Sequence, residues 1–149
     1  MYIVSACLAG FRTRYDGADC LDERVRQLVL AGKAVPVCPE QLGGLPTPRE
    51  PVEFAFGDGM DVLAGKHGVI RLRNKPEADG APYAQALLKG ASEVLRIARL
   101  YGATEAILKD GSPSCGTGYV HSGGRKRPGV GVTAGLLRLE GIVPLPFGP

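Results

Sequence analysis

Three cysteines of this chain each come after a short apolar run, and their thiols are the groups best suited to chemistry. Cys7, Cys38 and Cys115 occupy these positions, the last one across a loop that contains glycine and proline. If the runs are parallel strands, their carboxyl ends meet at the edge where open α/β sheets bind ligands. Three thiolates at one point predict a metal or iron–sulfur site with one coordination position left open.

The spacing of the cysteines excludes the familiar linear metal motifs. No Cys-x-x-Cys pair is present, so zinc ribbons and bacterial ferredoxins do not fit, and only the fold can bring the thiols together. Cys20 lies in the turn before Asp22, and we interpret it as ordinary packing rather than as a ligand. A zinc ion completed by His67 or His121 is an alternative, although neither histidine neighbours a cysteine.

Side chains suited to acid–base catalysis lie close to the cysteines in the sequence. Glu40 comes two positions after the second cysteine, where a carboxylate could activate water or relay a proton. Ser112 and Ser114 precede the third cysteine and could orient a substrate or water, although serine is also common in turns. Lys109 and Asp110 stand where the preceding strand ends. We therefore predict Glu40, Ser112 and Ser114 as catalytic candidates and Lys109 as a substrate contact.

A polar loop after the first apolar run is a candidate for substrate binding. Arg14 could hold a carbonyl or phosphate group, and Tyr15 could stack on a planar ring. Asp16 begins an Asp-Gly pair that is equally typical of a structural turn. Arg49, in a proline-rich segment, is a similar but weaker candidate.

Composition limits the class of protein. The 149 residues, 44% of them hydrophobic, predict a single domain over 1–149 with a sound core. A net charge of +3 gives no nucleic-acid footprint, and the run of Arg125, Lys126 and Arg127 is expected to be a solvated loop. No apolar stretch is long enough for a membrane span and no signal sequence is present, so we expect a cytoplasmic protein.

The order of the expected elements predicts the fold class. Strands and helices alternate, which is typical of an α/β protein with a mostly parallel sheet flanked by helices, in a Rossmann-like three-layer arrangement. Residues 39–82 and 110–131 are expected to be long loops, with short edge strands near 54–56 and 69–72. The expected strands span 2–6, 34–37, 105–108 and 142–145, and the expected helices span 22–32, 83–101 and 132–140.

Several segments together resemble the bacterial thiouracil desulfidase family, long known only as a domain of unknown function. The resemblance spans almost the whole chain, and its motifs are specific in combination. They are Val4-Ser5-Ala6-Cys7-Leu8-Ala9-Gly10, Arg14-Tyr15-Asp16-Gly17, Val37-Cys38-Pro39-Glu40, Gly43-Gly44-Leu45-Pro46-Thr47-Pro48-Arg49, Ala106-Ile107-Leu108-Lys109, Ser112-Pro113-Ser114-Cys115-Gly116 and Gly131-Val132-Thr133-Ala134.

The resemblance implies a [4Fe-4S] cluster held by Cys7, Cys38 and Cys115, with one open iron. It also implies non-redox removal of sulfur, as hydrosulfide, from a thiolated pyrimidine, a small-molecule thio-nucleobase. Catalysis would fall to Glu40 and to Ser112 or Ser114. The segment 119–127 is basic here, whereas many relatives are acidic and aromatic after the third cysteine, which leaves the substrate open.

Two other classes of function fit the same residues. A non-catalytic iron–sulfur or zinc carrier or sensor would need the thiols but no acid–base group. A zinc protein could act on nucleic acid through the basic run, and its binding would then depend strongly on salt. The sequence indicates neither a membrane nor a clear nucleic-acid partner, and it does not fix the oligomeric state.

Overall fold

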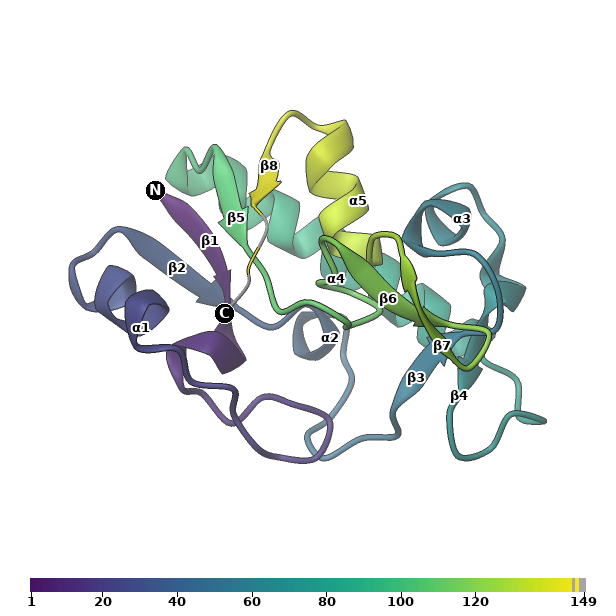
Figure 1. Cartoon of the computed structure of the whole chain (residues 1–149). Helices are drawn as coiled ribbons and strands as arrows, with labels where there is room; N and C mark the ends of the chain where they lie inside the picture. The colour runs from purple at the N-terminus through teal and green to yellow at the C-terminus, as the bar shows by residue number, and fades with distance from the viewer. Residues whose placement is uncertain (146, 148–149) are drawn as a thin grey trace.

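The computed structural model describes residues 1–145 and 147, and its strands form two sheets that lie side by side (Figure 1). The first sheet is wholly parallel, with the order β2-β1-β5-β8. It confirms the four strands predicted from the apolar runs, and Pro36 and Pro144 are tolerated because β2 and β8 are edge strands. These strands are β1 (Tyr2–Ser5), β2 (Ala34–Val37), β5 (Glu105–Ile107) and β8 (Val143–Leu145).

Helices cover both faces of this sheet and give the predicted three layers. On one face α1 packs through Val25 against Val4, and on the other α4 and α5 place Val94 and Leu137 against Ile3. Neighbouring residues of β1 thus point to opposite faces, as strand geometry requires. The helices are α1 (Glu23–Leu30), α2 (Pro39–Leu42), α3 (Gly59–Leu63), α4 (Ala81–Tyr101) and α5 (Val132–Leu139), with short 3₁₀ turns η1 (Ala6–Ala9) and η2 (His67–Val69).

A second, mixed sheet corrects the expectation of two long loops. Its order is β4-β3-β6-β7, with β3 inside the sheet rather than at an edge. The segments expected as loops contain α2, α3, η2 and all four strands of this sheet. The edge strand expected near 69–72 is confirmed as β4. These strands are too short, and β7 too exposed, to show a clear alternation of apolar and polar residues. They are β3 (Val52–Phe54), β4 (Ile70–Leu72), β6 (Tyr119–Ser122) and β7 (Arg125–Pro128).

The long helix α4 joins the two sheets. Its first half contributes Leu87 and Ala91 to the core of the second sheet, and its second half contributes Val94 and Ala98 to the core of the first. The apolar stripe predicted for 83–101 is therefore confirmed, and the helix ends at Gly102 in the left-handed region, at φ 65°. Among the described residues, none of the helices combines the length and apolar character needed to cross a membrane.

Two glycines set the distance between α2 and α4. A Cβ atom at Gly90 would overlap the carbonyl oxygen of Pro39, and one at Gly43 would overlap that of Ala86. Only glycine permits such close backbone contact. Because α2 starts directly after Cys38, this contact also fixes where that thiol lies.

Gly90→Ala is expected to lower the free energy of unfolding by about 1–3 kcal/mol, because the new Cβ meets backbone that cannot rotate aside. Chemical denaturation measures the change. Gly68→Ala is the matched control, since a Cβ there meets open space and should change stability by less than about 0.5 kcal/mol. Equal effects of the two substitutions would contradict the close contact.

Candidate active site

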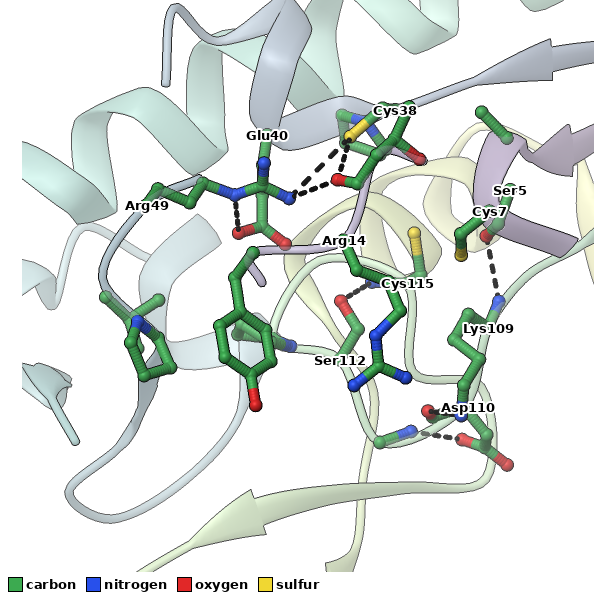
Figure 2. Close-up of a pocket in the computed structure, with 18 of the residues that line it drawn as sticks. Ser5, Cys7, Arg14, Cys38, Glu40, Arg49, Lys109, Asp110, Ser112 and Cys115 are labelled. Carbon is green, nitrogen blue, oxygen red and sulfur yellow. Dashed lines mark hydrogen bonds and ion pairs between the residues drawn. The ribbon is translucent and has the colours of Figure 1, made fainter. Parts of the chain in front are cut away.

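A cavity of about 210 Å³ lies at the carboxyl ends of β1, β2 and β5, and three cysteines line it. Cys7 lies in η1 directly after β1, and Cys38 lies between β2 and α2. Cys115 belongs to the loop that follows β5. Figure 2 shows the three side chains around this one space. The structure therefore brings together the three thiols that the sequence places at one sheet edge.

Two cysteines of the cavity, Cys7 and Cys115, are buried thiols with raised pKa values. Burial is the main reason that the pKa of Cys7 rises to about 12, and the neighbouring sulfurs of Cys20 and Cys38 raise it further. Burial also raises the pKa of Cys115, against a hydrogen bond with Ser5 that lowers it. All cysteines in the described part of the chain are free thiols. Cys7 and Cys115 are thus protonated near neutral pH when nothing is bound to them.

Ser112 lines the cavity and shapes the turn that carries Cys115. Its Oγ accepts the backbone N–H groups of Ser114 and Cys115, both at 3.1 Å. Ser114 is fully buried outside the lining, and its carbonyl oxygen accepts the N–H groups of Thr133 and Ala134 at the start of α5. The two candidate serines are therefore separated, and only Ser112 reaches the cavity.

Glu40 and Arg49 form an ion pair in the wall of the cavity. Arg49 Nε donates to Glu40 Oε1 at 3.1 Å, and the two side chains are only 4% and 15% exposed. The guanidinium also donates from Nη2 to the Thr13 carbonyl at 2.8 Å and lies 3.9 Å from the Cys38 sulfur. Within residues 1–145 and 147, Oε2 of Glu40 accepts no hydrogen bond. The carboxylate is thus fixed in orientation and keeps one oxygen available.

Three of the four predicted substrate contacts line the cavity. Arg14, Tyr15 and Lys109 belong to its lining, and Asp16 does not. Asp16 closes a turn instead, because its Oδ1 accepts the Ala18 N–H at 3.0 Å and pairs with Arg14 Nε at 3.4 Å. That backbone hydrogen bond is the main reason that the pKa of Asp16 is lowered. Its role is to hold the loop rather than to face the cavity.

Two further residues, Ser5 and Asp110, support the site through hydrogen bonds that the sequence does not predict. Ser5 is buried in β1, and its Oγ accepts the Lys109 N–H at 2.8 Å (Figure 2) while the side chain also contacts Cys115. Asp110 Oδ1 accepts three successive N–H groups of residues 117–119, each at 3.0 Å. The available signals were a serine inside an apolar strand and a carboxylate before a glycine-rich loop. Neither signal indicates which groups the side chain binds in the folded protein.

Of the residues named for the alternative zinc and nucleic-acid functions, some line the cavity and others do not. His121 lines it, and His67 lies in η2 outside the lining. Across the described ranges 1–145 and 147, no group of three histidine, cysteine or acidic side chains could hold one metal ion. The basic run expected as a loop forms the exposed strand β7, where Lys126 Nζ lies 4.0 Å from the ring centroid of Tyr119.

Comparisons with known proteins agree with the resemblance seen in the sequence. A family model described as 2-thiouracil desulfurase matches residues 2–145. Uncharacterized protein YbbK of Bacillus subtilis is 42% identical over 144 residues, covering 95% of this chain and 91% of that protein. The solved structure of the [4Fe-4S]-dependent thiouracil desulfidase TudS matches with a TM-score of 0.78 and 34% identity, over 96% of this chain and 87% of TudS. The chain therefore belongs to the 2-thiouracil desulfurase family.

Proposed function

We propose that this protein is an enzyme that removes sulfur from a thiolated pyrimidine. The overall change replaces the C=S group by C=O, with water supplying the oxygen and hydrosulfide and a proton leaving. The observation that carries the proposal is one cavity that three free cysteines share with the largely shielded Glu40–Arg49 ion pair, in a chain of this family. No electron transfer is needed, since the ring carbon keeps its oxidation state.

The proposed cofactor is a [4Fe-4S] cluster held by Cys7, Cys38 and Cys115. The donor set fits, because thiolate is the usual ligand of such clusters and the three thiols come from three separate loops around one cavity. Cys20 is outside that lining. When bound through three cysteines, the cluster supplies an iron with an open position that acts as a Lewis acid toward the substrate sulfur.

Glu40 is proposed to act on the attacking water. Arg49 holds one carboxylate oxygen at 3.1 Å, and the other oxygen can take the water proton as the new C–O bond forms. The same proton can then go to the departing sulfur or to a ring nitrogen. Because Arg49 also binds the Thr13 carbonyl, it ties Glu40 to the loop that carries the substrate contacts.

The remaining lining residues would bind and orient the pyrimidine. Ser112 uses the acceptor side of its hydroxyl for the Cys115 turn, so its O–H proton is left to donate to the ring. Arg14 can donate to the remaining carbonyl, and Tyr15 can stack on the ring face. Lys109 adds positive charge near the departing sulfur. Its Nζ donates to the Asp110 carbonyl at 3.1 Å, which restrains it.

We further propose that residues 1–149 act as one domain in a reducing cytoplasm. Free thiols persist where glutathione and thioredoxin keep cysteine reduced, and all cysteines in the described residues are free. The proposed substrate is a small thio-nucleobase, which the description of the family as 2-thiouracil desulfurase supports.

The experiment that tests the function is anaerobic reconstitution followed by a desulfuration assay. The protein is loaded with iron and sulfide, both are counted, and 2- and 4-thiouracil are offered while released sulfide and uracil are measured. Equal amounts of the two products, absent from the unloaded protein, are expected. Full loading without sulfide release would overturn the function, and binding of zinc in place of iron would overturn the cofactor.

Loading of the thiols is expected to become more favourable as the pH rises from about 7 to 9. The raised pKa values keep Cys7 and Cys115 protonated in the metal-free protein, so binding must release their protons. The apparent affinity should increase by up to about tenfold per pH unit for each proton released. Iron bound at a limiting supply, together with proton release into a weakly buffered solution, measures this. Loading that does not change with pH would contradict the buried, protonated state.

A further inference from the structure

We propose that Cys20 is a positioning residue that holds the Arg14 guanidinium toward the substrate. The inference rests on the proposed function and adds a residue that lies outside the cavity lining. Sequence reasoning gives Cys20 only a packing role. In the structure the Cys20 sulfur also accepts a hydrogen bond from Arg14, whose side chain lines the cavity.

Arg14 is held through two nitrogens of its guanidinium. Nη1 donates to the Cys20 sulfur at 2.9 Å, Nε lies 3.4 Å from Asp16, and the group sits 5.7 Å from the ring centroid of Tyr15. The contact with Cys20 is the main reason that the pKa of Arg14 is raised. In the described residues Nη2 has no hydrogen-bond partner. Nη1 and Nε are therefore engaged, and Nη2 remains to donate to a ligand.

Cys20 can anchor Arg14 because Cys20 is itself fixed beside the site. Its N–H donates to the Cys7 carbonyl at 2.9 Å, and its side chain packs against the hydrophobic side chains of Val4 and Leu8 and their neighbours in the core. The loop between Cys7 and Cys20 is thereby closed at its base, directly next to a proposed cluster ligand. The position of Cys20 relative to Cys7 then sets the position of Arg14.

The direction of Arg14 matters for the proposed reaction. Figure 2 shows its side chain reaching into the cavity on the side of Ser112 and Lys109, which line the same cavity. An arginine on an unanchored loop would lose rotamer freedom each time it bound a substrate carbonyl, which weakens binding. Cys20 removes that freedom in advance. Its effect should therefore appear in substrate binding rather than in the chemical step.

A double-mutant cycle between Cys20 and Arg14 tests this role in the cluster-loaded enzyme. Cys20→Ala is expected to raise KM for thiouracil and the dissociation constant of uracil about tenfold, with kcat changed less than about twofold. Cys20→Ser keeps an acceptor at the same place and should stay within about threefold of wild type. In an Arg14→Ala background, Cys20→Ala should add almost nothing, because the group that it positions is gone.

The outcomes separate this inference from the function on which it rests. Sulfide release by the wild type, with equal effects of Cys20→Ala in both backgrounds, overturns the positioning role alone. Loss of iron from Cys20→Ala also overturns it, since Cys20 would then be a ligand. A loaded wild type that neither binds uracil nor releases sulfide overturns the function and the inference together. Thermal unfolding of each variant shows whether folding itself has changed.

Discussion

Replacing Cys115 by serine is expected to abolish cluster binding and, with it, sulfide release. Cys115 is buried in the loop after β5, and it is the thiol that this loop contributes to the cavity. Loss of one of three ligands should leave less than about one iron per chain after desalting. Turnover should fall at least about 100-fold, because even changes outside the ligand shell cost 10–100-fold in metal sites.

The measurement is iron and sulfide content with the absorbance of the cluster, followed by the thiouracil assay. Cys20→Ser is the matched control for content, since it also removes one thiol but from outside the cavity lining. It should load fully. A Cys115→Ser protein that binds as much iron as Cys20→Ser would remove Cys115 from the ligand set and undermine the proposed three-cysteine site.

The sheet edge could be predicted because its signal is local. Each of the strands β1, β2 and β5 contains a short apolar run, and parallel pairing sends all three carboxyl ends to one side. The positions of Cys7 and Cys38 follow directly from that rule. The second sheet could not be predicted in the same way, because β7 is basic and wholly exposed and gains its order only by pairing with β6.

The contacts between the site residues were harder to predict than which residues form the site. Arg49 reaches Glu40 only because the segment before it turns back, with its N–H bound to the Tyr15 carbonyl at 2.9 Å. Nothing in the spacing of nine residues indicates that contact. Ser112 and Ser114 likewise look alike in sequence. Their difference depends on the docking of α5 on the Ser114 carbonyl, which is a tertiary contact.

Glu40→Gln is expected to lower kcat by about 10²–10⁴-fold while the cluster content stays at the wild-type level. The amide keeps the size of the side chain and an oxygen for Arg49, but it cannot take a proton from water. KM should change little, because Glu40 acts on water rather than on the pyrimidine. Single-turnover release of sulfide from thiouracil, with iron counted on the same sample, measures both effects.

This substitution also separates an enzyme from a carrier or sensor, since a carrier needs the thiols but no general base. Glu50→Gln is the matched control, because Glu50 lies outside the cavity lining and pairs with Lys75 at 3.5 Å. It should keep wild-type kcat and iron content. If Glu40→Gln turned over as fast as Glu50→Gln, the water would need another base. The Glu40–Arg49 ion pair would then have only a structural role, linking α2 to the segment that carries Arg49.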